Sequence, residues 1–218
     1  MNNRYFGLIG VFASILLFIG DMLLYGHFGS ASEFSKNIQI VANDSSQIRL
    51  FIGGILGPIG AMLYIAGFWH IYLNTKQYSR FGSIIIFISL SCMMFLGGAY
   101  HSIWTIRMLL LKYPLVSVDS SNLFITSFNC YYRTLFNISL SIGYLGGILL
   151  AILILFHKSS YPRWIVLVNP VILFLLMPLI KHVSYPFGSI LFGGYINIVF
   201  FIFLSISVIT TWKDKNIV

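Results

Sequence analysis

Charge is what this sequence most lacks. Only 8% of its 218 residues are Asp, Glu, Lys or Arg, whereas a soluble domain carries about 25%. Hydrophobic residues make up 58% of the chain, and the mean hydropathy is +0.91. This composition leaves no room for an additional soluble domain. We therefore expect residues 1–218 to form a single all-α domain of membrane-spanning helices.

Acidic residues are especially scarce, with 5 Asp and Glu against 13 Lys and Arg, which gives a formal net charge of +8. A nucleic-acid-binding protein gathers its basic residues on one face or stripe. Here they stand singly at the ends of apolar runs, as membrane topology signals do. Nucleic acid is therefore excluded as a partner, and membrane lipids are expected instead.

Cysteine is almost absent, since the chain contains only Cys92 and Cys130. Two cysteines at such different depths make no disulfide framework, and their spacing matches no metal motif. We interpret both as small buried packing residues, and no cofactor is predicted.

Long apolar runs are abundant, and each of them approaches or exceeds the length that crosses a bilayer as a helix. The first is interpreted as an uncleaved helix, although Ser30-Ala31-Ser32 leaves signal-peptide cleavage open. The pattern predicts a bundle of six transmembrane helices in a multi-pass protein of the cell membrane, with spans at 5–25, 48–73, 81–111, 124–157, 164–183 and 189–212.

An even number of spans places both termini on one side. The short loops on that side are basic, which predicts that both termini are cytoplasmic. The basic residues of this side are Arg4, Lys76, Arg80, Lys158, Arg163, Lys213 and Lys215. Those of the other side are Lys36, Arg49, Arg107, Lys112, Arg133 and Lys181.

Glycine and proline mark two of the spans. Gly53 and Gly57 form a small-xxx-small pair, which lets another helix backbone approach closely. Oligomerisation through such glycine-rich faces is therefore one expectation. Pro58 is expected to kink the second span, and Asn169-Pro170 and Pro178 interrupt the fifth.

Polar residues within the spans gather in the predicted outer half of the bundle. Asp21 and His101 lie there on separate spans, and lipid offers neither of them a hydrogen-bond partner. The fourth span adds a polar stripe at helical spacing, formed by Cys130, Thr134, Asn137, Ser141 and Tyr144. The predicted ligand-binding residues are Asp21, Arg49, Tyr100, His101, Arg133, Asn137, Ser141, Tyr144 and Asn197.

Each of these residues also has a structural interpretation. Asp21 can pair with Arg49 or Arg133 to hold helices together. His101 can bond a backbone carbonyl, and the stripe can make interhelical hydrogen bonds. The remaining histidines and Lys181 stand at span ends or in loops and are expected at the interface, where long side chains reach water; they are His27, His70, His157 and His182.

Three functional hypotheses follow. In the first, the polar cluster is the floor of an outward-facing pocket that binds a small or amphipathic, lipid-like ligand, as in a transporter or sensor. The alternative is a membrane-embedded hydrolase, in which Asp21, His101 and His182 act by acid–base or metal-assisted chemistry, with zinc as the ion. The third is a structural subunit. One Asp and one His favour recognition, so binding is the preferred interpretation and catalysis stays open.

Short motifs along nearly the whole chain resemble a group of uncharacterised six-helix integral membrane proteins of bacteria. They are Gly20-Asp21 with Leu23-Leu24-Tyr25, Leu56-Gly57-Pro58, Tyr100-His101, Tyr161-Pro162-Arg163-Trp164, Asn169-Pro170 and the segment 194–197. The resemblance implies a six-helix membrane fold and assigns no activity.

Overall fold

The computed structural model describes residues 3–113, 118–156 and 158–212, and in these residues the chain forms helices and no strand. Side chains are described for the same ranges except residues 118–123. The elements in chain order are α1 (Asn3–Tyr25), η1 (Ala31–Glu33), α2 (Phe34–Asp44), α3 (Gln47–Thr75), α4 (Arg80–Lys112), α5 (Val118–Leu155), η2 (Arg163–Val168), α6 (Pro170–Phe174), α7 (Met177–Ile180), α8 (Gly188–Gly193) and α9 (Tyr195–Thr210).

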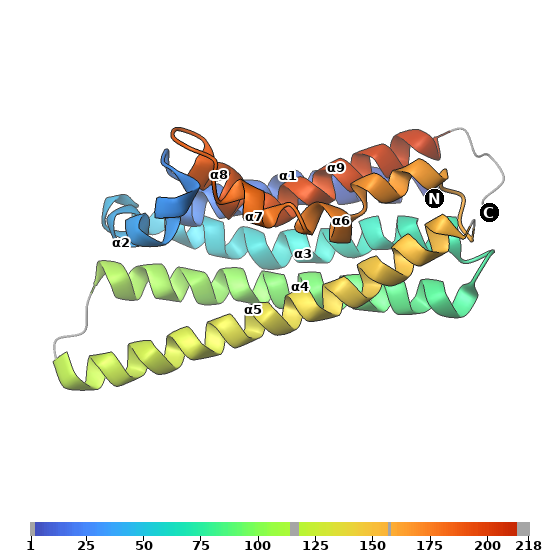
Figure 1. Cartoon of the computed structure of the whole chain (residues 1–218). Coiled ribbons are helices and arrows are strands. Elements are labelled where there is room, and N and C mark those ends of the chain that lie inside the picture. Colours follow the sequence, from blue (N-terminus) through green and yellow to red (C-terminus); the bar gives the residue numbers. More distant parts are fainter. Residues whose placement is uncertain (1–2, 114–117, 157, 213–218) are drawn as a thin grey trace.

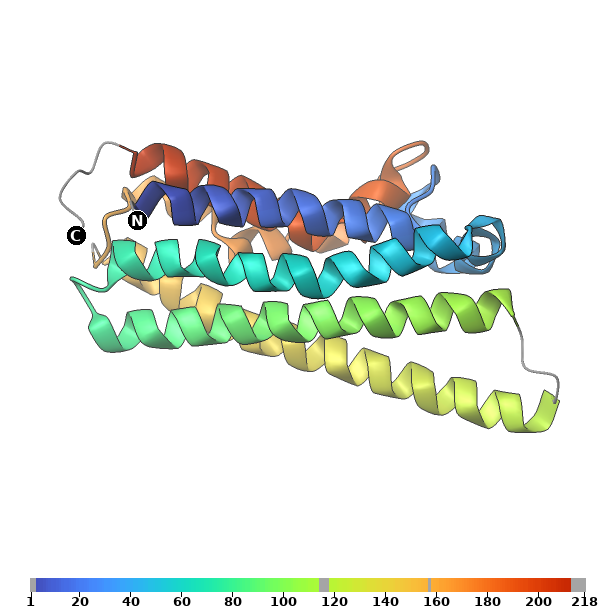
Figure 2. The ribbon, with the colours of Figure 1, turned by 180° about the vertical axis from the view of Figure 1, so that it is seen from behind.

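Four helices in the described residues are long and apolar enough to cross a membrane: α1, α3, α4 and the Phe124–Leu155 part of α5. They match the first four predicted spans closely. They lie side by side along the bundle in the order α1, α3, α4, α5 (Figures 1 and 2). On its other side α1 packs against α9 and α8, while α6 packs against α9 and α5.

Glycines bring α1, α3 and α4 together. A Cβ added to Gly10 of α1 would lie 2.5 Å from Cα of Gly67 on α3, which is closer than any real side chain approaches. On the other side of α3, a Cβ on Gly57 would lie 2.2 Å from Cβ of His101 on α4. The close approach expected of small residues in apolar helices therefore occurs within the chain itself.

The fifth predicted span, 164–183, is not one helix. The chain forms η2, α6 and α7 in succession, because Pro170 and Pro178 supply no backbone N–H. The side chain of Asn169 accepts a hydrogen bond of 3.0 Å from the backbone N–H of Val171 and so caps α6.

The sixth predicted span, 189–212, is also divided, since Gly194 separates α8 from the 16 residues of α9. None of these shorter helices reaches the roughly 20 residues that cross a bilayer alone. The number of spans beyond four therefore stays a prediction.

The start of α1 and the end of α9 lie at the same end of the bundle (Figure 1). There the Cζ atom of Arg4 stands 5.0 Å from the ring centroid of Trp212. His157, Lys213 and Lys215, three of the residues used in the sequence argument, lie outside the described residues.

Candidate functional site

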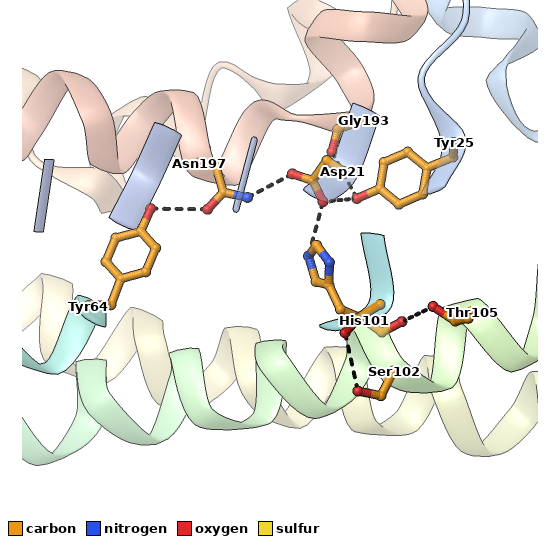
Figure 3. Close-up of polar contacts among 9 residues, drawn as sticks. Asp21, Tyr25, Tyr64, His101, Ser102, Thr105, Gly193 and Asn197 are labelled. Carbon is orange, nitrogen blue, oxygen red and sulfur yellow. Dashed lines mark hydrogen bonds and ion pairs between the residues drawn. The ribbon is translucent and has the colours of Figure 1, made fainter. Parts of the chain in front are cut away.

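Asp21 is the centre of a buried polar cluster (Figure 3). Asp21 belongs to α1, and the residue is 3% exposed. Nε2 of His101, on α4, lies 3.1 Å from Oδ1, and the hydroxyl of Tyr25 donates to the same oxygen. Nδ2 of Asn197, on α9, donates to Oδ2 at 2.7 Å. The predicted meeting of Asp21 and His101 is thus present in the structure, with Asn197 beside them.

Helical spacing and glycine explain how these groups meet. Asp21 and Tyr25 are four residues apart on α1 and therefore lie on one face. His101 reaches the carboxylate by passing close to α3, where Gly57 has no side chain to obstruct it. A larger residue at position 57 would push α4, and with it the imidazole, away from Asp21.

Asn197 is held from its other end by α3. The hydroxyl of Tyr64 donates to Oδ1 of Asn197 at 3.0 Å, which leaves the amide nitrogen to face Asp21. Hydrogen bonds therefore run from α3 through α9 and α1 to α4, and they fix the carboxylate in one orientation.

Neither predicted arginine pairs with Asp21. The guanidinium of Arg49 donates to the backbone carbonyls of Leu23, Met22 and Gly26 at 2.9, 3.0 and 2.8 Å, so it caps the end of α1. Arg133 is exposed on α5. Among the described residues, His101 is the one basic side chain within salt-bridge range of Asp21.

A cavity of about 250 Å³ opens beside this cluster. Its polar side is formed by Asp21, Tyr25, Tyr100, His101 and Asn197. Most of its remaining wall is apolar or aromatic, and comprises Leu17, Phe34, Met93, Met94, Gly97, Trp104, Phe136, Ser139, Leu140, Met177, Phe192, Gly193 and Ile196.

Two cavity residues have a buried ring nitrogen without a hydrogen-bond partner in the described part of the chain: His101 at Nδ1 and Trp104 at Nε1. Because the carboxylate of Asp21 can only accept, Nε2 of His101 donates to it, and a neutral ring then has an acceptor at Nδ1. Trp104 carries a donor alone. Unpartnered buried polar atoms of this kind are uncommon in folded proteins.

The polar stripe of α5 does not line the cavity. Cys130, Thr134, Asn137 and Ser141 are exposed on the outer face of the helix. Cys92 of α4 is exposed as well, so the prediction that both cysteines are buried is wrong. Tyr144 is half-buried and meets the ring of Phe174 edge-on at 5.9 Å. The spacing of the stripe identifies one helix face correctly, but it carries no information about which face turns inward.

The inward face of α5 instead presents Phe136, Ser139 and Leu140 to the cavity. The hydroxyl of Ser139 donates to the backbone carbonyl of Met93 at 2.8 Å. These three positions were missed by the sequence reasoning, which followed polarity. The aromatic side chain of Phe136, on the face opposite the polar stripe, is the sequence feature that could have identified this inward face.

The trio proposed for a metal is not assembled. Within residues 3–113, 118–156 and 158–212, no three His, Cys, Asp or Glu side chains are grouped so that they could hold a metal ion. His182 and its neighbour Lys181 are exposed beyond α7. Asp21 and His101 therefore provide two ligand groups and no third.

A second buried polar network, which sequence reasoning missed, lies at the other end of the bundle. His70, expected at the interface, is 1% exposed, and its Nε2 lies 3.0 Å from Oγ of Ser207. The Ser207 hydroxyl donates to that of Tyr161 at 2.8 Å, and Asn74 donates there at 3.3 Å. Burial raises the pKa of Tyr161, so its hydroxyl keeps its proton. The i, i+4 spacing of His70 and Asn74 is the signal that could have found it.

Among the comparisons with known proteins, one gives a match, and that match is to a family model. No curated protein and no solved structure matches the chain significantly. Residues 1–214 match the model of a family of unknown function, DUF6796. This match covers nearly the whole chain, in agreement with the resemblance to an uncharacterised family, and the protein therefore belongs to the DUF6796 family of unknown function.

Proposed function

We propose that this protein is an integral membrane protein of the cell membrane that binds a small amphipathic ligand in the cavity beside Asp21 and His101. In this proposal the chain passes through the membrane six times, the proline-broken α6–α7 segment and the α8–α9 segment complete the bundle, and both termini are cytoplasmic. The cavity then lies toward the outer side, as a transporter or sensor of external ligands requires.

The observation that carries the proposal is the uneven polarity of the cavity. The carboxylate and imidazole of Asp21 and His101 stand on one side, and methionine, leucine and aromatic side chains form most of the remainder. Ligand sites commonly combine apolar walls with a few polar groups that fix orientation. An amphipathic ligand matches both parts, with its apolar body on the wall and its polar group at the cluster.

The unpartnered nitrogens of His101 and Trp104 support the same proposal. A buried donor or acceptor without a partner costs about 1–3 kcal/mol. A ligand oxygen that accepts from Trp104 Nε1 removes part of this cost. This hydrogen bond favours the bound state of a ligand with a polar group, and a wholly apolar ligand cannot form it.

Hydrolysis is the second candidate, and one observation favours it. Asp21 holds the imidazole of His101 through Nε2, which leaves Nδ1 as the basic nitrogen. A carboxylate-oriented imidazole is a common general base. Binding remains preferred because the carboxylate already accepts three hydrogen bonds, from His101, Tyr25 and Asn197, which suits a fixed recognition group.

Gly97 allows a direct test. It lines the cavity, and a Cβ added there meets nothing within 4 Å. Gly97→Leu therefore fills the cavity without removing a polar group, and Gly97→Ala is its matched control. Protein purified from native membranes is examined by native mass spectrometry for a retained small molecule.

We expect the wild-type protein and Gly97→Ala to carry the molecule and Gly97→Leu to lose at least nine-tenths of it. Equal occupancy in all three proteins, or no bound molecule in the wild type, contradicts the proposal. Release of a chemically changed product from an added lipid ester, lost in His101→Gln, favours hydrolysis instead.

A further inference from the structure

We infer that the ligand of this cavity is an organic cation, with a substituted ammonium group seated among the aromatic rings and facing Asp21. The inference rests on the proposed function and adds the sign of the ligand's charge. It comes from three features of the cavity wall: its rings, its single carboxylate and its methionines.

Aromatic rings surround the cavity from five helices. Six of the residues lining the cavity are aromatic: Tyr25 of α1, Phe34 of α2, Tyr100 and Trp104 of α4, Phe136 of α5 and Phe192 of α8. The faces of Trp, Tyr and Phe rings attract cations, and several such rings around one site are the known means of recognising quaternary ammonium groups.

The planes of neighbouring rings are inclined to one another, by 39° between Tyr100 and Phe136 and by 56° between Phe34 and Phe192. Tyr25 meets two of the rings edge-on. The ring centroids of Tyr25 and Phe34 lie 5.6 Å apart with 81° between their planes. Those of Tyr25 and Trp104 lie 5.3 Å apart at 73°. A set of rings at such angles forms the sides of a cage, whereas a single stack would present one face only.

Asp21 gives the cavity its charge. Among the residues that the structure describes, it is the one acidic residue that lines the cavity, and none of the lining residues is Lys or Arg. Its two carboxylate oxygens are fixed in position by His101 Nε2 and Asn197 Nδ2. An anionic ligand would bring a second negative charge beside this buried one, at a large cost in a site of low polarity.

The aromatic wall already holds one cation on its outer side. The Cζ atom of Arg107 lies 4.6 Å from the ring centroid of Trp104 and 5.2 Å from that of Tyr132. Arg107 is not among the residues that line the cavity. The positive charge of Arg107 repels a further cation. The preference of the cavity for a cationic ligand therefore depends on the carboxylate of Asp21, and a test must remove the charge of Asp21.

Met93, Met94 and Met177 supply the remaining feature. Methionine is flexible and polarizable, and it adapts to groups of different shape. Together with the rings, these side chains suit the alkyl substituents of an ammonium nitrogen and a short apolar chain attached to it.

The test uses two esters of the same shape. Hexanoylcholine carries a trimethylammonium group, and 3,3-dimethylbutyl hexanoate carries a carbon atom in place of the nitrogen. Both offer an ester carbonyl as a hydrogen-bond acceptor. Their dissociation constants are measured on the full-length protein in dodecyl maltoside, with protein-free micelles subtracted and hexanoate as the anionic probe.

We expect the cationic ester to bind at least tenfold more tightly than the neutral one, and hexanoate not to bind. In Asp21→Asn this ratio falls at least tenfold. In Phe136→Leu, which keeps an apolar side chain but removes a ring, it falls severalfold, so the test does not depend on the folding of the Asp21 variant. An unchanged ratio in a folded Phe136→Leu contradicts the cage.

Equal binding of the two esters overturns the inference and leaves the proposed function standing, since a ligand still occupies the cavity. Failure of all three probes to bind overturns the inference as well. The proposed function is then decided by the retained molecule in the Gly97 variants, which is measured without any added probe.

Discussion

Asn197 Nδ2 lies 2.7 Å from Asp21 Oδ2, although the two residues are 176 positions apart in the sequence. The bond joins the last helix of the chain to the first in the middle of an apolar bundle. Loss of the bond leaves a buried carboxylate oxygen without that donor.

Replacing Asn197 with Ala removes partners from both Asp21 and Tyr64. We expect the free energy of unfolding to fall by about 2–4 kcal/mol, since two buried polar groups lose a hydrogen bond. The matched control is Asn137→Ala, where the same amide is exposed on α5 and a change within about 0.5 kcal/mol is expected. Unfolding in detergent, followed by circular dichroism, compares the two. Equal losses of stability would show that the Asp21–Asn197 bond is not formed.

Replacing Gly10 or Gly97 with alanine should change the stability of the protein in opposite directions. A Cβ on Gly10 would lie 2.5 Å from the backbone of Gly67, so Gly10→Ala forces α1 and α3 apart and should cost about 1–3 kcal/mol. A Cβ on Gly97 meets nothing within 4 Å, so Gly97→Ala should stabilise the helix by up to about 1 kcal/mol. Thermal unfolding midpoints of the two variants measure this difference. A stable Gly10→Ala would contradict the helix packing.

Arg49 is expected to act on stability and not on binding. Its guanidinium satisfies three backbone carbonyls at the end of α1, and Arg49→Met should lower the unfolding free energy by about 1–3 kcal/mol. Ligand affinity at temperatures where the variant is folded should stay within twofold of the wild type, because Arg49 does not line the cavity. A large loss of affinity with unchanged stability would mean that Arg49 contributes to ligand binding, as the sequence predicted.

Ser139 and Ser141 provide a matched pair on α5. Ser139 is buried and lines the cavity, whereas Ser141 is exposed on the opposite face. Ser139→Leu should lower the affinity for hexanoylcholine at least tenfold by filling space and losing the bond to Met93. Ser141→Leu should leave it unchanged. The reverse result would mean that α5 is rotated, with its polar stripe facing the ligand.

The long helices could be predicted from the sequence because apolar length is a local property. The runs at 5–25, 48–73 and 81–111 became α1, α3 and α4 with ends shifted by one or two residues. The fifth run is also apolar, but Pro170 and Pro178 interrupt its backbone hydrogen bonds. Hydrophobicity alone therefore overstated the continuity of that segment.

The candidate site could be predicted in part. A carboxylate and an imidazole in apolar helices need partners, and from this requirement the sequence predicts that Asp21 and His101 meet. Polarity was a poor guide elsewhere, because Asn137 and Ser141 point outward while Phe136 faces the cavity. The rotation of α5 depends on how it packs on α4, and no feature of α5 alone determines it.

The most direct test of the account is a crystal structure of the wild-type protein purified from native membranes with no ligand added. We predict an ordered molecule between Asp21 and Phe136, with Asp21 and His101 in hydrogen-bond contact and an oxygen of the molecule bonded to Trp104. A cavity closed by its own side chains, or Asp21 and His101 too far apart to bond, would contradict the proposed binding site.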